Sequence, residues 1–393
     1  MEDPVPRRIL GKISDRTLSI ERSPLYTIIE LAKGMKDVIR LNIGEPDFKT
    51  PKHIIAAAKQ AMNEGFTHYA PDRGDQELRT LIAEELKKDL HVSYDPENEV
   101  LITAGGQAAL YVAITTTVNP GDEVIVLAPY YPPYLVDIQL AGGKPIFVTL
   151  SDETNFSPTL EAVESNVTDK TKLIIILSPN NPTGAVYDEK FLKATAEVAR
   201  SHNLLVVSDE VYWKIIYNDV KHCSIASFPE MRERTIIVNS FSKTYAMTGW
   251  RIGHLAAEKE FINQMLKIHH SINICANASA QRAAVAALTG LQDCVHEFLE
   301  EYDRRRKFVV KALNDLPGFK CLMPQGAFYV FPNIQELGVS SVELARSLVT
   351  DARVITVPGS GFGTEGYLRI SYTKPIDTLK EAIERIRPVV EKL

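Results

Sequence analysis

The most constraining feature of the sequence is an alternation of short apolar runs with longer amphipathic stretches, from about residue 50 to 290. The apolar runs are rich in Val and Ile and do not alternate apolar with polar residues, as the strands of a sheet with one solvent-exposed face would. This pattern is typical of strands buried on both faces. They lie at 100–103, 123–127, 145–148, 172–177, 204–208, 235–238 and 251–256. Helical patterns separate several of them, at 107–117, 189–201 and 259–270. This predicts an α/β fold with a mostly parallel seven-stranded sheet covered by helices.

The last hundred residues follow a different, mixed pattern. They predict a long helix near 295–313, extended segments around 326–331, 354–357 and 368–372, and a final helix from Ile376. A chain of 393 residues also exceeds the length at which one hydrophobic core usually stops growing. We therefore predict a large domain and a smaller α+β domain that an N-terminal arm joins, over residues 49–289, 290–393 and 1–48 respectively.

The charge balance and the cysteine spacing make several kinds of partner unexpected. The 44 basic and 50 acidic residues are interspersed and give a net charge of −6, which argues against nucleic acid or an anionic membrane. The one basic cluster, YDRRRK at 302–307, falls in a helical pattern and is interpreted as a solvated helix face. Cys223, Cys275, Cys294 and Cys321 are far apart, so we expect neither a metal site nor a disulfide framework.

We expect a soluble, cytoplasmic protein. The N-terminal segment MEDPVPRRIL lacks the apolar core of a signal peptide. The strongest apolar run, at 173–177, is far shorter than the ~20 residues of a membrane helix. The cysteine usage fits a reducing compartment.

Three groups of polar residues follow or interrupt the apolar segments. Asp209 ends the run LLVVSDE, at the carboxyl end of a strand, where open α/β sheets bind ligands; an N-cap or a salt bridge is the alternative. Gly105, Gly106 and Gln107 join a strand to a helix, whose free N–H groups can bind a phosphate; a plain tight turn is the alternative. Arg369 is the only basic residue in an extended apolar segment, and a buried arginine needs a partner.

Lys243 lies just past a predicted strand, in the segment SFSKTYAMTGWRIG at 240–253. Alone, such a lysine could lie in an exposed loop. Other segments supply matching groups, namely IGEPDF at 43–48, SPNNPTG at 178–184 and SDEVY at 208–212. With them the chain, from about residue 25 onward, resembles the class I and II aminotransferases of pyridoxal phosphate (PLP) fold type I. It looks most like their archaeal and bacterial branch of aspartate or aromatic amino acid aminotransferases.

The resemblance implies that Lys243 forms a Schiff base with pyridoxal 5′-phosphate and moves the proton during catalysis. A free lysine, with a pKa near ~10.4, does neither well at neutral pH. Desolvation and a neighbouring positive charge would lower that pKa, and Arg251 is the candidate neighbour. Asp209 would face the pyridine nitrogen and keep it protonated.

The remaining site residues are also assigned by the resemblance. Tyr212 and Asn181 would contact the ring O3′ oxygen, and Tyr131 would stack on the ring. The phosphate would be held by Gly105, Gly106, Gln107, Ser240, Ser242 and Arg251. Tyr69 would reach the phosphate of the neighbouring subunit, which implies a homodimer with shared active sites. The substrate would be bound by Arg369, Gly44 and Asn181, with Arg369 gripping its α-carboxylate.

The predicted function is therefore a ping-pong exchange of an amino group between an L-amino acid and a 2-oxo acid, with 2-oxoglutarate as the expected acceptor. A PLP-dependent lyase, such as a cysteine-sulfur lyase, or an aminocyclopropane-forming synthase shares the same signature and stays an alternative. A transcriptional regulator with an aminotransferase-like domain is a remote one, because IGEPDF is reached by residue 43, which leaves no room for a helix-turn-helix domain.

The donor is the least determined part of the prediction. Part of the aspartate-specific branch has a lysine after the glycine pair, where this chain has the neutral Gln107. We therefore expect an aromatic or broad donor range, with aspartate possible. The family also leads us to expect cis peptide bonds at Asn181–Pro182 and Ala128–Pro129.

Overall fold

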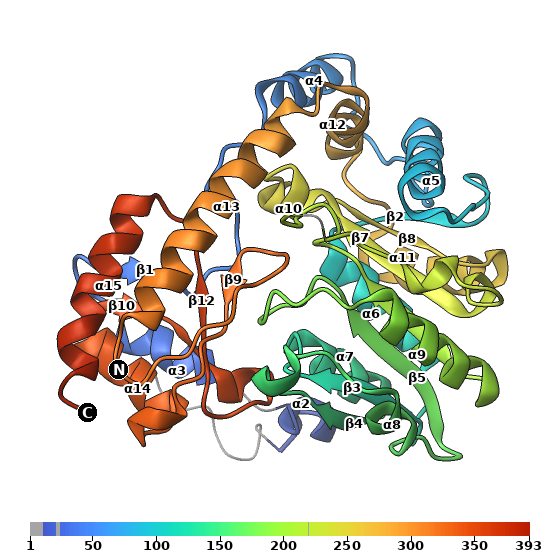
Figure 1. Ribbon diagram of the computed structural model, residues 1–393. Coiled ribbons are helices and arrows are strands. Elements are labelled where there is room, and N and C mark those ends of the chain that lie inside the picture. The colour runs from blue at the N-terminus through green and yellow to red at the C-terminus, as the bar shows by residue number, and fades with distance from the viewer. Residues whose placement is uncertain (1–10, 21–23, 219) are drawn as a thin grey trace.

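A central seven-stranded sheet organises the computed structural model, which describes residues 11–20, 24–218 and 220–393 (Figure 1). Its strands are β2 (Val100–Thr103), β3 (Glu123–Ala128), β4 (Lys144–Thr149), β5 (Thr171–Leu177), β6 (Leu205–Asp209), β7 (Thr235–Ser240) and β8 (Gly253–Ala256). They lie in the order β2-β8-β7-β6-β5-β3-β4. Strand β8 is antiparallel to both of its neighbours, β2 and β7, whereas the other pairs are parallel. The predicted sheet is thus confirmed, with each apolar run on one strand.

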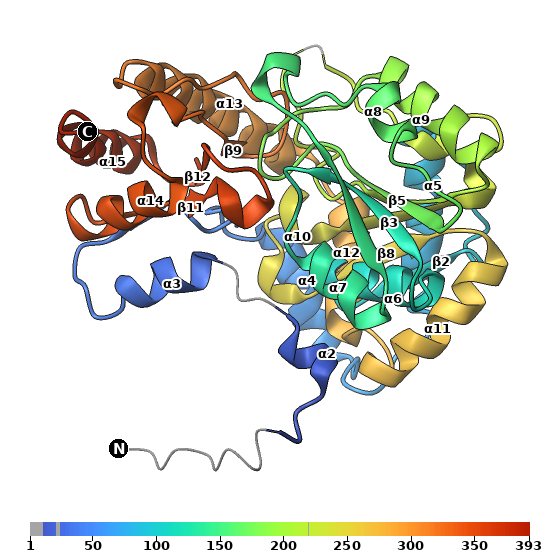
Figure 2. The same ribbon diagram turned by 90° about the horizontal axis from the view of Figure 1, so that it is seen from below.

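Both faces of the sheet are buried, as the lack of alternation predicted. In β5, Leu173 and Ile175 pack in one apolar cluster, whereas Ile174 and Ile176 pack in another on the opposite face. Figure 2 shows α6 (Gly106–Thr117) and α7 (Pro133–Ala141) on one side of the sheet, and α8 (Leu160–Glu164) and α9 (Glu189–Ser201) on the other. The remaining helices of this region are α4 (Lys52–Asn63), α5 (Gln76–Leu90), α10 (Phe241–Thr244), α11 (Lys259–Asn273) and α12 (Ala278–Thr289).

The C-terminal segment builds a separate layer of helices and short strands. Its helices are α13 (Asp293–Asn314), α14 (Ser341–Thr350) and α15 (Ile376–Val390). Its antiparallel sheet has the order β11-β12-β9, formed by β11 (Val357–Pro358), β12 (Leu368–Ser371) and β9 (Tyr329–Val330).

The N-terminal segment contacts both parts of the molecule. Strand β1 (Ile39–Arg40) pairs in parallel with β10 (Val354–Ile355). Helix α3 (Pro24–Leu31) packs against α14, whereas α2 (Asp15–Leu18) contacts α7. The exact domain boundaries stay a prediction.

The interpretation of the basic cluster 302–307 is wrong for its central arginines. Arg304 is exposed, but Arg305 and Arg306 are buried in α13. The Arg306 guanidinium donates to the Pro324 carbonyl at 2.6 Å, and that of Arg305 pairs with Asp47 at 2.8 Å. The interpretation failed because one face of α13 is covered by other segments, which supply carbonyl and carboxylate partners.

The expected cis bond at Ala128–Pro129 is confirmed, and the one at Asn181–Pro182 is wrong. Within the described residues the second cis bond is Ser178–Pro179. Around Asn181 the chain instead closes a turn, in which the Gly184 N–H donates to the Asn180 carbonyl at 2.9 Å and the Thr183 N–H to the Asn180 side chain.

Membrane-spanning helices and clusters of metal-binding side chains are both absent from the described residues. None of their helices combines the length and the apolar character that crossing a membrane requires. No group of three or more His, Cys, Asp or Glu side chains there has an arrangement that could hold a metal ion.

Candidate active site

A cavity of about 350 Å³ gathers most of the predicted site residues at the carboxyl ends of the central strands. It is lined by Gly44, Glu45, Gly106, Gln107, Leu110, Tyr131, Leu177, Asn181, Asp209, Val211, Tyr212, Ser240, Ser242, Lys243, Thr248, Arg251, Tyr329 and Arg369. These residues come from the large sheet, the IGEPDF loop and the C-terminal layer. The volume suits a small organic ligand.

Lys243 lies in the cavity wall, where the short helix α10 follows β7. Its Nζ donates to the Gly44 carbonyl at 2.6 Å. Burial lowers the pKa of this amine to about 8, and the positive charge of Arg369 contributes more to the decrease than that of Arg251. Desolvation was the expected cause, but the main cationic neighbour is Arg369. Roughly a tenth of such an amine is neutral at pH 7, far more than of an ordinary lysine, and the neutral form is the one that a nucleophile or a base requires.

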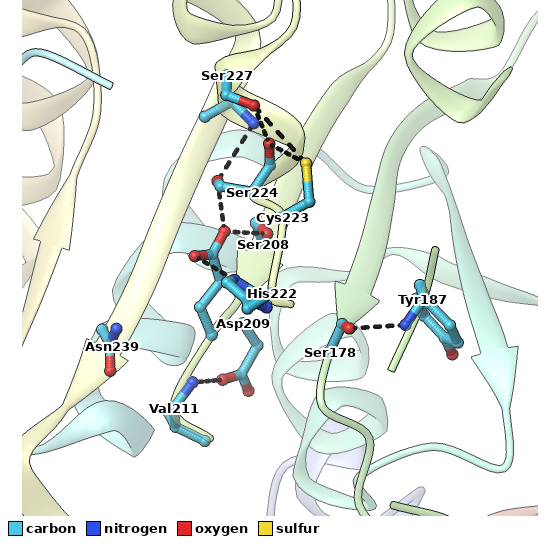
Figure 3. A network of polar contacts seen from close by, with 12 residues as sticks. Ser178, Tyr187, Ser208, Asp209, Val211, His222, Cys223, Ser224, Ser227 and Asn239 are labelled. Atoms are coloured by element: carbon cyan, nitrogen blue, oxygen red, sulfur yellow. Dashed lines mark hydrogen bonds and ion pairs between the residues drawn. The ribbon is translucent and has the colours of Figure 1, made fainter. Parts of the chain in front are cut away.

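Asp209 ends β6 and is only 2% exposed. Burial raises the pKa of its carboxyl to about 6, against hydrogen bonds that lower it. One donor is the Tyr134 hydroxyl at 2.6 Å. The other is the Val211 N–H at 3.3 Å, which Figure 3 shows. The carboxyl is therefore mostly ionised at neutral pH, and it can hold a protonated ring nitrogen. The sequence reasoning missed Tyr134, although its position three residues after Tyr131 was a usable signal.

Tyr212 and Asn181 line the cavity next to groups from the C-terminal layer. The Tyr212 hydroxyl lies 2.8 Å from the hydroxyl of Tyr329, a residue of β9 that the sequence reasoning missed. The Asn181 side-chain oxygen accepts from Arg369 Nη1 at 3.2 Å. A side chain at position 44 would collide with Tyr329, because a Cβ on Gly44 would lie 2.1 Å from the Tyr329 hydroxyl.

Arg369 is buried in β12 and only partly satisfied. Its Nη2 donates to the Asn42 carbonyl, and its guanidinium lies over the Tyr329 ring at 4.8 Å. Its Nε is buried and has no hydrogen-bond partner in the described part of the chain. No ion pair of Arg369 occurs among the described residues either, so its charge is available to an anion that enters the cavity.

The start of α6 and the Arg251 guanidinium form the polar end of the cavity. Gly105 caps α6 with a φ of +86°, which favours glycine, and a Cβ there would lie 2.6 Å from Arg251 Nη2 and would displace the guanidinium. Ser240 Oγ donates to Ser242 Oγ at 2.9 Å beside them. Arg251 bonds only to carbonyl oxygens, of Thr248 and Ala104, within the described residues. Free N–H groups and an arginine without a carboxylate partner fit a phosphate.

Two further predicted residues, Tyr131 and Gln107, line the cavity, and a third, Tyr69, lies outside it. Tyr131 lines the cavity, with its ring edge-to-face on Tyr134 at 5.5 Å. Tyr69 is 79% exposed and lines a different hollow, of about 240 Å³, so it does not reach the cavity of its own chain. Gln107 lines the cavity, and its amide nitrogen donates to Asp137 at 3.2 Å.

The donor set fits a phosphorylated pyridine aldehyde. It combines an amine of lowered pKa, a buried carboxylate for a ring nitrogen, hydroxyl and amide groups beside the ring, and an anion-binding end. The absence of a side chain at Gly105 lets the Arg251 guanidinium lie against the start of α6 at that end. The residues present therefore match the cofactor that the sequence motifs imply.

Comparison with known proteins gives one consistent picture. A family model described as aminotransferase class I and II matches residues 36–386. An aspartate aminotransferase of Pyrococcus abyssi is 44% identical over 384 residues, which cover 97% of this chain and 98% of that protein. Aromatic-amino-acid aminotransferase 2 of Thermococcus litoralis is 41% identical, with the same coverage.

Solved structures agree with the sequence comparisons. The aromatic aminotransferase of Pyrococcus horikoshii is 44% identical and has a TM-score of 0.89, over 94% of this chain and 99% of that one. The aspartate aminotransferase of Thermus thermophilus with maleate is 36% identical and has a TM-score of 0.91, over 96% and 99% of the two chains.

Proposed function

This chain belongs to the class I and II aminotransferases, and from that premise we propose which of its residues bind the cofactor and substrates and which donors it uses. It is a PLP-dependent enzyme that exchanges an amino group between an amino acid and a 2-oxo acid. The lyase and regulator alternatives are not favoured by relatives that are aminotransferases. When bound, PLP supplies an aldehyde for the amino group and a ring that withdraws electrons from the substrate Cα.

The chain's own residues then have separate tasks. Lys243 would hold the cofactor at its aldehyde carbon and would move the proton at the substrate Cα, a task for which an amine with a pKa of about 8 is suited. Asp209 holds the ring nitrogen in its protonated form. Tyr212 and Asn181 bind the ring oxygen, and Tyr131 covers the ring face. Closing these groups around the substrate excludes water from the reacting atoms.

The cofactor phosphate and the substrate carboxylate are assigned to two separate sets of residues, each with one arginine. The phosphate is held by Gly105, Gly106, Gln107, Ser240, Ser242 and Arg251. Arg369 holds the α-carboxylate, supported by its buried and unpartnered Nε. Asn181 and Gly44 complete that subsite. The α-carboxylate contact orients every amino acid in the same way, whatever its side chain.

We further propose an aromatic or broad donor range. The supporting observation is that the cationic residues lining the cavity, in the described part of the chain, are Lys243, Arg251 and Arg369, all of which already have a task. None remains for the side-chain carboxylate of aspartate, and an unpaired charge in a cavity is costly. The proposed acceptor is 2-oxoglutarate.

The donor range is tested by kcat/KM values for tyrosine, phenylalanine, alanine, kynurenine and aspartate with one acceptor. We expect kcat/KM for at least one aromatic donor to exceed that for aspartate by about tenfold or more. A tenfold difference corresponds to the free energy of roughly one unsatisfied contact to a charged group. A hundredfold lead of aspartate would show that the reasoning from the cavity charges is wrong.

We also propose a homodimer in which Tyr69 completes the phosphate site of the partner. The exposed ring of Tyr69, near exposed Phe66 and Met62, supports this, because large exposed apolar groups in one region mark an association surface. Tyr69→Phe should weaken PLP binding and leave the dimeric mass unchanged in light scattering. A monomeric holoenzyme with full PLP affinity would contradict the proposal.

The proposed location is the cytoplasm. In the structure the four cysteines are free, and Cys321 is buried. This usage fits a reducing compartment. Cell fractionation with an enzyme marker tests the proposal, and recovery of the activity outside the cytoplasmic fraction would contradict it.

A further inference from the structure

Ser208 and Asp209, the last residues of β6, and Glu210 directly after them have side chains that alternate between two sides of the strand. Asp209 lines the active-site cavity. Ser208 and Glu210 share the other side, where Ser208 Oγ donates to Glu210 Oε1 at 2.8 Å. Figure 3 shows the Asp209 carboxylate turned towards Val211, away from Ser208, Ser224 and His222. A second polar network therefore lies directly behind the residue proposed to face the cofactor nitrogen.

The centre of this network is the Glu210 carboxyl group, which is 1% exposed. Ser224 Oγ donates to Glu210 Oε1 at 2.6 Å, and His222 Nε2 lies 3.0 Å from Glu210 Oε2. The His222 side chain is itself only 6% exposed. Burying a carboxylate is costly unless hydrogen bonds and an opposite charge offset the lost solvation. Ser208 and Ser224 supply hydrogen bonds without charge, and His222 can supply both.

The other groups around Glu210 do not offset its charge. Burial, and to a smaller extent the Glu210 charge, raises the pKa of the Tyr94 phenol and of the Cys223 thiol, so both are neutral at neutral pH. Lys88, Lys214 and Lys221 line the same outer hollow as His222, but the Lys214 amine is paired with Glu85 and Asp89, and neither Lys88 nor Lys221 forms an ion pair with Glu210 among the described residues. Among the described residues, His222 is thus the group that both contacts the Glu210 carboxyl and can be cationic.

The Glu210 charge also acts on the active site. The pKa of the Asp209 carboxyl is raised first by burial, and the neighbouring Glu210 adds to that increase. A like charge one residue away favours retention of a proton at Asp209 and at any cation bound to it. The strength of this effect depends on whether His222 cancels the charge.

We propose that Glu210 and His222 form a buried ion pair that positions and electrostatically balances Asp209, so that the carboxylate facing the cofactor nitrogen is next to a neutral pair. The inference rests on the role of Asp209 under the proposed function. Glu210 and His222 touch neither cofactor nor substrate, so they are positioning residues. A purely structural role, in which the network only ties the segment 222–224 to β6, is the competing explanation.

The test is a pH titration of the visible absorbance of the lysine-bound cofactor in the holoenzyme. Glu210→Gln keeps the shape of the side chain and removes its negative charge, so it should lower the titration midpoint by about one pH unit. This is the order expected for a unit charge near the titrating cofactor. His222→Gln keeps an amide donor and removes the positive charge, so it should raise the midpoint. The double variant removes both charges and should return to within about 0.3 unit of the original.

One control variant separates an effect of charge from an effect of structure. Ser224→Ala removes a hydrogen bond to Glu210 without a change in charge, and it should leave the midpoint nearly unchanged. Single Glu210 and His222 variants that shift the midpoint in the same direction, or by no more than Ser224→Ala, would overturn the inference. If Glu210→Gln does not retain the cofactor, the direction of the His222→Gln shift against Ser224→Ala still decides the question.

Asp209→Asn distinguishes this inference from the site assignment on which it rests. If that variant leaves the titration unchanged, Asp209 does not act on the cofactor and the proposed site is wrong. If it shifts the midpoint while Glu210→Gln does not, only the role of the Glu210–His222 pair is refuted.

Discussion

Tyr134→Phe provides a quantitative test of how Asp209 is kept ionised. The substitution removes one hydroxyl, which donates to Asp209 at 2.6 Å in a fully buried contact. A hydrogen bond to a charged acceptor is worth roughly 1.5–3 kcal/mol and one between neutral groups about 0.5–1.5 kcal/mol. The ionised form of Asp209 therefore loses about 1.4 kcal/mol more than the neutral form, which is about one pKa unit. The pKa should rise from about 6 to about 7.

The sign of the effect on stability follows from linkage. The pKa of Asp209 is raised in the folded protein above its ordinary value of 3.8, so the folded state holds this proton more tightly than the unfolded state. The resulting stabilisation is fully present below about pH 3.8 and is lost as the pH rises through about 6, or about 7 in the variant. The free-energy difference between variant and wild type should consequently grow by about 1.4 kcal/mol from pH 4.5 to pH 8.5.

Urea unfolding of the apoprotein at the two pH values, at one fixed protein concentration, measures this difference. Tyr187→Phe is the matched control, because Tyr187 is buried but donates to no carboxylate in the described structure. Its difference from wild type should be the same at both pH values. The reasoning is refuted if the Tyr134→Phe difference is also the same, within about 0.4 kcal/mol, at pH 4.5 and pH 8.5.

Three further predictions concern the cofactor and substrate. Lys243→Ala should abolish the absorbance of the lysine-bound cofactor and nearly all turnover; a variant that keeps both would contradict the assignment. Arg369→Lys cannot make a bidentate contact, so kcat/KM should fall by about 10- to 150-fold with the cofactor spectrum unchanged; a change confined to the spectrum would contradict its role. Gly105→Ala places a Cβ 2.6 Å from the Arg251 guanidinium and should weaken PLP binding, as equilibrium dialysis can measure. Gly121→Ala has a similarly positive φ but open space around it, so equal PLP affinities of the two variants would refute the steric argument.

Much of the large sheet could be predicted because its strands are buried on both faces. Their runs of Val and Ile are local features of the sequence, and each run coincides with one observed strand to within one or two residues. Asp209 was found because it ends such a run, Arg369 because it is the only basic residue in an extended apolar segment, and Lys243 because it lies in a motif just past a strand. The motifs around these residues then indicated the family and its chemistry.

The burial of Arg305 and Arg306 could not be predicted from the same kind of pattern. The run YDRRRK has the composition of a solvated helix face, and only the packing of α13 decides which arginines meet water. Asp47 and Pro324, their partners, lie 258 and 18 residues away in the chain.

The sequence by itself determined the strands of the sheet, the lysine and the family, because these depend on residues that are close along the chain. Only the tertiary structure decided that Tyr134 holds Asp209 across 75 residues, that Tyr329 meets Tyr212 across 117, and that His222 lies against Glu210. Periodicity and motifs report the neighbours of a residue along the chain. Side-chain partners depend on where strands and helices cross in space, and the free energy of those buried contacts is fixed only when the whole core has packed.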